Sequence, residues 1–241
     1  MSVSQNIPQH ARISTRDQIS ARLQAEIITG KYQPGQRLVE RELAERFNVS
    51  SIPIREALQV LETQGLVIKQ PNRGCSVVKL RPEEIEQMCE LRDVLEPKVA
   101  EWAACRMDAE GSQRLLAQAE LLREAAEAQD LPAFYAADID FHRTFWELSG
   151  NDYAARMLEA VVGSLFASGL RAARGIDLRF EYSKHERLLR ALVDGRPSDA
   201  ALLLGNIAGS FRGTLRSHIA AEREQAHDVA SEMHANLPGS G

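Results

Sequence analysis

Two polar side chains in the second half of the chain have the types and the spacing of metal ligands. Asp138 and His142 stand four residues apart, so in a helix their side chains lie on the same face, one turn apart. A carboxylate and an imidazole placed in this way can bind one divalent metal ion, and His185, on a separate helix, could supply a third ligand. The same spacing also fits an intrahelical pair or a cap of internal polar groups, and the residues alone do not decide between these readings.

Arg92 is a candidate for binding an anion. It lies among Met88, Leu91, Leu95 and Val99 in a predicted amphipathic helix. A guanidinium that points inward from such a helix is costly unless it meets an anion, and its planar fork fits a carboxylate through two hydrogen bonds. The sequence leaves two kinds of partner open: the carboxylate of a bound ligand, or an Asp or Glu side chain of the protein itself.

The stretch over 40–74 has the pattern of a winged helix-turn-helix. Its apolar residues recur at three- and four-residue spacing, stop at Asn48-Val49-Ser50 and then resume the same period. They are Leu43, Ala44, Phe47, Ile54, Ala57, Leu58 and Leu61. After Gly65, a good helix stop, the runs 66–68 and 76–78 predict two strands joined by a turn. With a helix over 15–29, this predicts a three-helix unit carrying a two-stranded wing.

Arginines are placed on this unit where they could contact nucleic acid. Ser50 and Ser51 suit the N-cap of the second helix, so its opening turn carries small polar groups and Arg55. In a helix-turn-helix that turn reaches base edges in the major groove, while flanking arginines hold phosphates. Arg41, Arg55 and Arg73 are positioned for this contact. The alternative is that they are surface charges in helix pairs, but three of them on one small unit favour nucleic acid.

The rest of the chain is helical in pattern almost throughout. We expect helices near 82–108, 111–128, 131–148, 152–171, 177–194 and 197–224, separated by Gly and Pro. The predicted fold class is mainly α: an N-terminal winged helix-turn-helix over 15–79, a linker over 80–82 and a C-terminal all-helical bundle over 83–224. Residues 1–14 are expected to be a mobile arm and residues 225–241 a disordered tail.

The 241 residues carry a net charge of −5 that is divided unevenly. Residues 1–80 contain 11 Lys and Arg against 7 Asp and Glu, a net charge of +4, and the remainder has a net charge of −9. The basic part can meet phosphate, with an attraction that weakens as salt rises. No apolar run is long enough to span a bilayer and no signal peptide is recognisable, so we expect a soluble cytoplasmic protein. The three cysteines lack CxxC spacing and are expected to be reduced thiols.

Residues 15–79 closely resemble the winged helix-turn-helix of GntR-family transcription regulators, through ERELAERFNVSSIPIREAL followed by LETQGLV and RGCSV. The resemblance implies that the chain contacts double-stranded DNA through Arg41, Ser50, Ser51, Arg55, Arg73 and Gly74. Many relatives have Arg in the recognition turn where this chain has Ser51. Because a bidentate Arg–guanine contact contributes roughly 1–3 kcal/mol of discrimination, the preferred half-site is expected to differ from the one common in the family.

The second part resembles the all-helical FCD effector domain of the FadR branch of this family. The resemblance is carried by Glu90-Leu91-Arg92, Leu95-Glu96-Pro97, Ala103-Ala104, Asp138-Ile139-Asp140-Phe141-His142, Ser149-Gly150-Asn151, and His185 before a leucine-rich helix. It implies that Arg92 faces an effector cavity. It also implies that Asp138, His142 and His185 belong to a site for a divalent metal such as zinc, nickel or manganese.

One ligand of the implied metal site is not matched in this sequence. In relatives an Asp and three His bind the metal, and the position of the last His falls at about Ile207, beside Asn206. His218 stands 11 residues further on, about 16 Å along a helix, and cannot easily substitute. The sequence leaves open a site of three side chains completed by water, by the effector or by Asn206.

The predicted function is a ligand-responsive transcription regulator, a repressor rather than an activator. We expect a homodimer whose two winged units bind a palindromic operator, with a small carboxylate-bearing metabolite as the effector and no membrane partner. One alternative is a constitutive DNA-binding protein whose helical part only dimerises. The other is a metal-dependent hydrolase in which Asp138, His142 and His185 activate water. We do not expect an enzyme, because no nucleophile motif or phosphate loop accompanies these residues.

Overall fold

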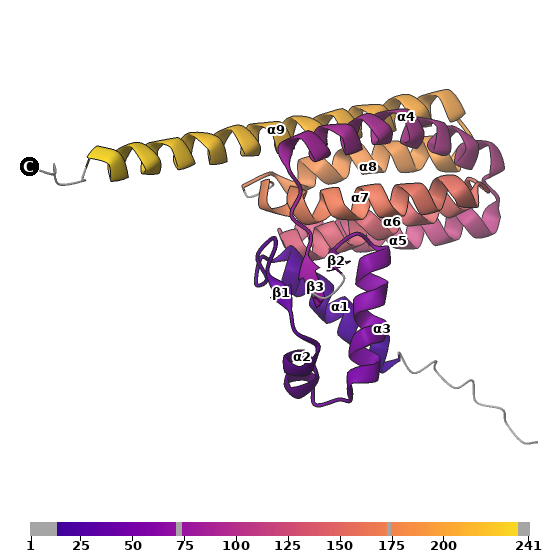
Figure 1. Cartoon of the computed structure of the whole chain (residues 1–241). Helices are drawn as coiled ribbons and strands as arrows, with labels where there is room; N and C mark the ends of the chain where they lie inside the picture. The colour runs from indigo at the N-terminus through magenta and orange to yellow at the C-terminus, as the bar shows by residue number, and fades with distance from the viewer. Residues whose placement is uncertain (1–13, 71–73, 173–174, 236–241) are drawn as a thin grey trace, which may run out of the picture.

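The computed structural model describes residues 14–70, 74–172 and 175–235. In this part of the chain a small unit with a three-stranded sheet lies against a larger unit built only of helices (Figure 1). The fold class is the predicted one, mainly α with a winged helix-turn-helix followed by a helical bundle. The predicted arm lies outside the described residues except for Ser14. Among the described helices, none has both the length and the apolar composition needed to cross a membrane.

Three helices form the small unit: α1 (Thr15–Ile28), α2 (Glu40–Phe47) and α3 (Ser51–Thr63). At the start of α1, the Ser14 hydroxyl accepts a hydrogen bond from the backbone N–H of Asp17. Asn48 ends α2 in the left-handed region, with a φ of 53°, which makes the tight turn into α3. Ser50 occupies the N-cap of α3, but its side chain makes no capping hydrogen bond. The Ser50 hydroxyl therefore does not cap the backbone N–H groups of α3.

The wing has three strands rather than the predicted two. They are β1 (Arg37–Leu38), β2 (Val67–Gln70) and β3 (Gly74–Val77), paired antiparallel in the order β1-β3-β2. Arg37 lies opposite Ser76 and Leu38 opposite Cys75. A turn with Gly35 at a φ of 80° leads into β1. Two residues are too few to give an alternating pattern, and for this reason the sequence did not reveal the third strand.

The larger unit contains α4 (Pro82–Arg106), α5 (Ala109–Glu127), α6 (Leu131–Leu148), α7 (Asp152–Ala172), α8 (Leu178–Val193) and α9 (Pro197–Ala235). Pro82 begins α4, and the Glu84 carboxylate accepts a hydrogen bond from the backbone N–H of Arg81 at 2.7 Å. Helix α6 places several aromatic side chains, among them Phe141 and Phe145, in the bundle core. It contacts α4, α5 and α7, so polar side chains on its inner face meet those of its neighbours.

Helix α9 is longer than expected. The sequence predicts a helix that ends near residue 224, but α9 continues to Ala235 and spans 39 residues. In Figure 1 it extends well beyond the other helices. The prediction of disorder is therefore wrong for 225–235, while 236–241 lie outside the described residues. The physical reason is visible in the sequence, since no Gly or Pro occurs between Gly213 and Pro238 and good helix formers continue across the expected end.

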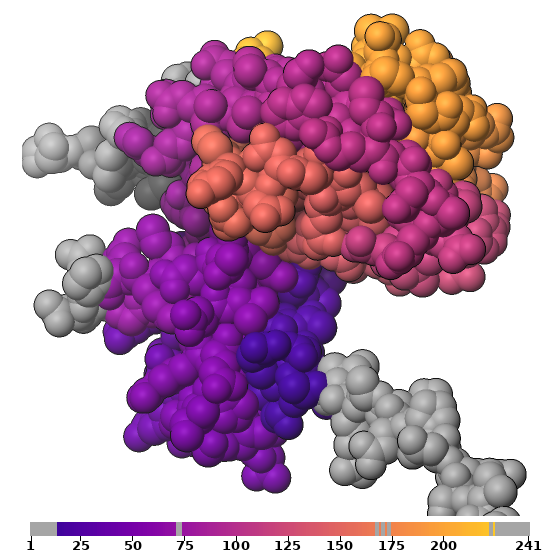
Figure 2. All heavy atoms as spheres, turned by 90° about the vertical axis from the view of Figure 1, so that its right-hand side faces the viewer, coloured from indigo at the N-terminus to yellow at the C-terminus, as the bar shows by residue number. Residues whose placement is uncertain are grey.

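The small unit rests directly on α7 of the bundle. Ser164 Oγ donates a hydrogen bond to the backbone oxygen of Gly65, just after α3, at 2.8 Å. Next to it, a Cβ atom added to Gly163 would lie 1.7 Å from the backbone oxygen of Gln64. Ile28, at the end of α1, is buried in the core cluster of the bundle. In Figure 2 the salmon-coloured α7 sits directly on the small unit. The junction is thus packed so closely at Gly163 that no side chain fits there.

Candidate nucleic-acid interface and buried ligand site

The beginning of α3 and the whole of α2 lie at the end of the small unit that is remote from the bundle (Figure 1). Ser50 and Ser51 are exposed there. The side chain of Arg41 is 85% exposed and that of Arg55 is 66% exposed. The sequence-predicted residues of the helix-turn-helix therefore share one accessible end of the molecule, where a groove of nucleic acid could meet them.

Both arginines at this end have an acidic neighbour. Arg55 Nε donates to Glu40 Oε2 at 2.6 Å, which joins α3 to α2. Arg41 Nε lies 3.7 Å from Glu45 Oε1, one turn along the same helix. The helix-pair alternative is thus realised for Arg41, but exposed ion pairs contribute little to stability. A phosphate can replace Glu45 at little cost, and Glu40 fixes the direction in which Arg55 points.

The wing adds one cation that the sequence did not single out. Arg73 lies outside the described residues, whereas Gly74 begins β3 with a φ of 81° and is exposed. The guanidinium of Arg37, on β1, lies beside Gly74, with Nη2 3.4 Å from the position that a Cβ atom would take. Arg37 was missed because its strand is too short to be read from sequence.

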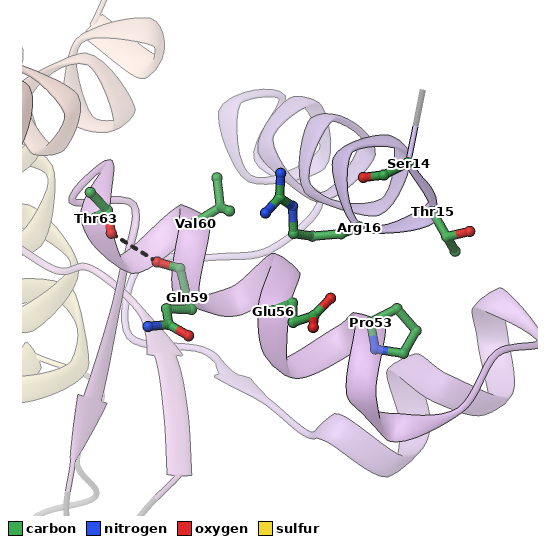
Figure 3. Close-up of a pocket in the computed structure, with 8 residues that line it drawn as sticks. All are labelled: Ser14, Thr15, Arg16, Pro53, Glu56, Gln59, Val60 and Thr63. Carbon is green, nitrogen blue, oxygen red and sulfur yellow. Dashed lines mark hydrogen bonds between the residues drawn. The ribbon is translucent and has the colours of Figure 1, made fainter. Parts of the chain in front are cut away.

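The small unit carries an open groove of about 640 Å³ between the start of α1 and one side of α3. Figure 3 shows that Arg16 and Glu56 project into it from the two helices, and that Thr63 Oγ1 donates to the backbone oxygen of Gln59. Its lining combines one basic and one acidic side chain with short polar groups. Such a lining selects no particular ligand charge, so this groove is not the candidate ligand site.

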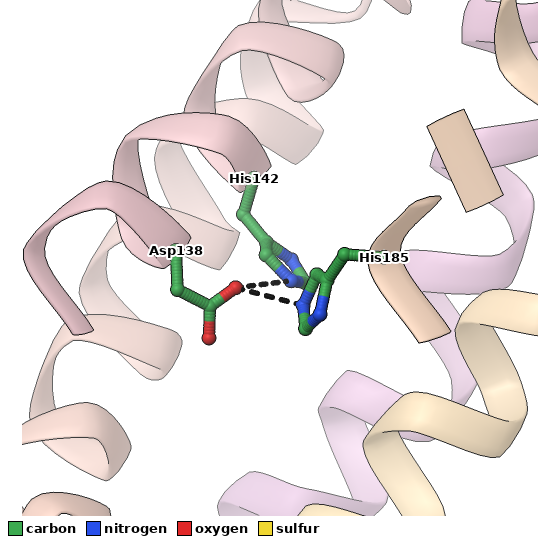
Figure 4. Close-up of side chains that lie close together, drawn as sticks. All are labelled: Asp138, His142 and His185. Atoms are coloured by element: carbon green, nitrogen blue, oxygen red, sulfur yellow. Dashed lines mark ion pairs between the residues drawn. The ribbon is translucent and has the colours of Figure 1, made fainter. Parts of the chain in front are cut away.

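Inside the bundle, the structure brings the three predicted metal ligands together. Asp138 and His142 come from α6 and His185 from α8, and all three are buried. Asp138 Oδ1 lies 2.9 Å from His185 Nε2 and 3.4 Å from His142 Nε2 (Figure 4). One ligand atom from each residue lies within 4.8 Å of the others. The side chains converge on a single point.

Hydrogen bonds outside this point determine which imidazole nitrogens face it. His142 Nδ1 lies 2.9 Å from Glu96 Oε1, and His185 Nδ1 lies 2.9 Å from the backbone oxygen of Glu181. Carboxylate and carbonyl oxygens only accept, so each Nδ1 carries a proton, and in the neutral form of each ring the lone pair of Nε2 faces inward. This is the arrangement in which histidine binds a metal, with the second nitrogen held by a hydrogen bond.

The converging atoms fit a cation. Asp138 Oδ1, His142 Nε2 and His185 Nε2 are buried and make no hydrogen bond of acceptable geometry among the described residues. With both rings neutral, three acceptors would face one another and repel. A metal ion between them, or a proton on His185 Nε2 in its absence, relieves this repulsion. Burial alone would raise the pKa of the Asp138 carboxyl, but His185, His142 and Arg92 hold it below its usual range. For donor atoms about 2.1 Å from a metal, the observed spacings of 2.9 and 3.4 Å are suitable.

Arg92 meets one of the two kinds of partner that the sequence left open, a carboxylate of the protein itself. Its side chain is 2% exposed, and Nε donates to Glu96 Oε2 at 2.5 Å. The guanidinium lies against two aromatic rings, 5.0 Å from the centre of Phe211 and 5.6 Å from that of Phe166. Nη1 remains buried with no hydrogen-bond partner in the described structure. The ion pair with Glu96 therefore leaves Nη1 of the guanidinium able to donate a hydrogen bond to an anion.

These groups border one cavity of about 40 Å³, lined by residues of α4, α6, α7, α8 and α9. Arg92, Asp138, Glu181 and His185 supply its charged lining, and Glu181 is paired with Lys184 at 2.6 Å. Ile207, at the position expected for a last histidine, also lines it, whereas Asn206 is exposed. The expectation that Asn206 could complete the metal site is therefore wrong, because its side chain lies on the outside of α9. Water or the effector remains as the further ligand.

Glu96 is the residue of this site that sequence reasoning missed. Its carboxylate, completely buried, contacts Arg92 with one oxygen and His142 with the other. A signal was present, since Arg92 and Glu96 stand four residues apart on one predicted helix, the spacing of a side-chain pair. The contact with His142 depends on how α4 packs on α6, which no local pattern reveals.

Two family models match the chain. Residues 15–77 match the bacterial regulatory proteins of the gntR family, and residues 87–210 match the FCD domain. Together the matches cover the small unit and most of the bundle.

Individual relatives agree with these matches. The gluconate operon transcriptional repressor of Bacillus licheniformis is 30% identical over 182 residues, 74% of this chain and 73% of that protein. The Nta operon transcriptional regulator of Aminobacter aminovorans is 28% identical over 190 residues, 76% of this chain and 87% of that one. Among solved structures, Escherichia coli McbR/YncC superimposes with a TM-score of 0.71 at 21% identity, over 86% of this chain and 100% of that one. At this identity, the superposition supports the fold alone.

Proposed function

This chain belongs to the gntR family of bacterial regulatory proteins and carries an FCD domain, and from that premise we propose that it is a homodimeric repressor released by a small carboxylate-bearing metabolite. The small unit is the DNA-binding head. Two heads related by a two-fold axis bind a palindromic operator. The contacts come from the end of the head remote from the bundle and from the wing. They are made by Arg41, Ser50, Ser51, Arg55, Arg73 and Gly74.

One observation carries the effector half of the proposal: Arg92, whose buried Nη1 has no partner in the described structure, lines the same cavity as Asp138 and His185, two of the three converging side chains. Asp138, His142 and His185 would hold a divalent metal, which when bound supplies a Lewis-acidic centre for an anionic oxygen. Arg92 donates from Nη1 to an oxygen of the same anion, and its contacts with Glu96 and the two Phe rings hold it in place. A carboxylate has the charge and the two oxygens that this arrangement requires.

The size of the cavity favours a small effector that must move side chains to enter. One water needs roughly 10–15 Å³ of such a volume, so a cavity of about 40 Å³ holds only a few waters. The rings of Phe166 and Phe211, stacked with centres 5.5 Å apart, occupy the space beside Arg92. Phe166 lies on α7, two residues after Ser164 of the junction. An effector that displaces this ring therefore acts on the helix that carries the head.

Such a displacement can regulate DNA binding only if the effector has different affinities for two arrangements of the heads. The contact of Gly163 and Ser164 with the head supplies an element that could exist in two positions. The effector-bound position would change the separation of the two heads and lower their affinity for the operator.

The direct test is operator binding by the full-length chain. DNA from its own genomic neighbourhood is titrated with protein, and the complex is then challenged with a panel of organic and sugar acids, with and without divalent metal. Release by one acid would support the proposal. Specific binding that no acid changes would favour a constitutive DNA-binding protein. Absence of specific binding would contradict the proposal that the chain is a repressor of genes beside its own.

Replacing Arg55 with alanine should weaken operator binding by about 5- to 150-fold, because the recognition helix loses a charged contact at its exposed start. Electrophoretic mobility shift at fixed salt measures the change, and analytical ultracentrifugation checks that the dimer is intact. Arg114→Ala is the matched control, since Arg114 also forms an exposed ion pair, with Glu147 at 2.5 Å, but on the bundle. If the Arg55 variant and the control bound the operator with equal affinity, Arg55 would not be part of the DNA interface.

Protein purified without chelator and reloaded with zinc, nickel or manganese should contain about one metal ion per chain. His185→Ala should lower this content to less than about a tenth of an equivalent, because two ligands do not form a tight site. Elemental analysis after gel filtration measures both. Asp140→Ala is the control, since Asp140 lies on α6 near the cavity ligands but is exposed and pairs with Arg143. A metal content in the wild type as low as in the His185 variant would reject the metal site.

A further inference from the structure

The carboxylate of Glu96 connects Arg92, in the anion-binding half of the proposed ligand site, with His142, in its metal-binding half. One oxygen receives the hydrogen bond of Arg92 Nε at 2.5 Å, and the other lies 2.9 Å from His142 Nδ1. The exposed fraction of the Glu96 side chain is 0%, as is that of His142. A single carboxylate, without contact with water, thus holds one group from each half.

Such an arrangement is not explained by stability alone. A buried ion pair is often no more stabilising than apolar side chains of the same volume, because both charges lose their hydration. An Arg–Glu pair would need only one carboxylate oxygen, or both oxygens on the same guanidinium. Here the second oxygen is directed to an imidazole on another helix, and that imidazole turns its other nitrogen towards Asp138.

We propose that Glu96 is a positioning residue that prepares His142 and Arg92 for one shared ligand, a divalent cation carrying an anion. The inference deepens the proposed function and rests on it. Glu96 fixes the proton of His142 on Nδ1, so that the Nε2 lone pair points to the cation. The same carboxylate holds Arg92 by Nε, so that Nη1 stays directed at the anion.

The two histidines differ in a way that makes this role testable. His185 Nδ1 is held by the backbone oxygen of Glu181, which no side-chain substitution removes. His142 Nδ1 depends on the side chain of Glu96. A change at Glu96 therefore affects one histidine and leaves the other in place.

Glu96→Gln keeps the shape of the side chain and changes one acceptor into a donor. Arg92 can only donate, so the amide oxygen turns towards Arg92 and the amide NH₂ faces His142. His142 then accepts at Nδ1 and carries its proton on Nε2, where it blocks the cation. Loss of such an outer hydrogen bond typically weakens metal binding 10- to 100-fold.

The experiment uses Co²⁺ as the probe and the full-length chain. The affinity is measured by competition with a chromophoric chelator, and the visible absorption of bound Co²⁺ reports the ligand set. We expect Glu96→Gln to bind Co²⁺ about 10- to 100-fold more weakly than the wild type, with an altered spectrum. Glu159→Gln is the control, because it removes a comparable acid, paired with Arg143 between α6 and α7 at 2.6 and 2.8 Å, that does not line the cavity.

A second measurement has a wild-type arm that does not depend on the variant folding. Nitrogen-15 NMR of the metal-free wild type should show His142 as the tautomer with its proton on Nδ1, and the glutamine variant should show the proton on Nε2. A wild-type His142 protonated on Nε2, or unchanged Co²⁺ affinity in Glu96→Gln, would overturn the role of Glu96 while leaving the metal site. No Co²⁺ binding by the wild type would instead overturn the proposed metal site itself.

Discussion

Replacing Arg92 with alanine is expected to lower the free energy of unfolding of the bundle by about 3–5 kcal/mol. The change removes the charged partner of Glu96, whose carboxylate lies in the core with no access to water. An uncompensated buried charge is far more unfavourable than the loss of one ordinary hydrogen bond. Burial raises the pKa of Glu96, and it is Arg92 first and His142 second that hold this pKa below its usual range. Urea denaturation in the presence of a chelator measures the loss without interference from bound metal.

A double variant separates the structural role of Arg92 from its role in binding. Arg92→Met combined with Glu96→Met replaces both charges with apolar side chains of similar length, and should recover most of the lost stability. It should not recover the response to any acid, because the guanidinium proposed to bind the anion is gone. Arg114→Ala, which breaks an exposed pair, serves as the control and should change stability little. If Arg92→Ala were as stable as this control, the pair with Glu96 would not be buried in solution.

Replacing Gly163 with alanine is expected to detach the DNA-binding head from the bundle. The added Cβ would lie 1.7 Å from the backbone oxygen of Gln64 and 2.8 Å from its carbonyl carbon. Backbone atoms cannot move away by changing a rotamer, so the two units must separate. The hydrogen bond from Ser164 to Gly65 should be lost with them. Small-angle scattering should show a larger radius of gyration, and proteases should cut the segment between β3 and α4, residues 78–81, more rapidly.

Gly213→Ala provides the matched control for the junction. Gly213 lies within α9, and a Cβ atom added there meets no atom within 4 Å. This variant should scatter as the wild type does and gain up to about 1 kcal/mol of stability from better helix propensity. The Gly163 variant should still bind operator DNA and the effector, but the effector should no longer release the DNA. Scattering by Gly163→Ala that matches the control would contradict a packed junction.

The sequence predicted those parts of the fold in which local pattern and tertiary packing agree. Leu43, Ile54, Leu58 and Leu61 recur at helical spacing and are buried as that spacing predicts, and the winged helix-turn-helix followed by a helical bundle is confirmed. Strand β1 was missed because its two residues are held by pairing with β3 rather than by their own pattern. The end of α9 was misplaced because its sequence contains no stop signal before Pro238.

The candidate site could be predicted only where its residues share one helix. The spacing of Asp138 and His142 placed both on one face of α6, and the structure adds that His185 reaches them from α8. Glu96 and His142 stand 46 residues apart, so their contact follows from helix packing and not from any motif. The roles of these residues in binding metal and effector stay predictions until the experiments above are made.

The absence of a side chain at Gly163 also limits how this protein can be recombined with others. A chimera that places residues 15–77 on a different bundle would inherit the head, but the surface beneath it would come from the new partner. If that surface carried any side chain opposite Gln64, the chimera would bind its operator, but the new ligand would not release it. Designers of biosensors from this chain should therefore transplant the Gly163-Ser164 pair together with the head.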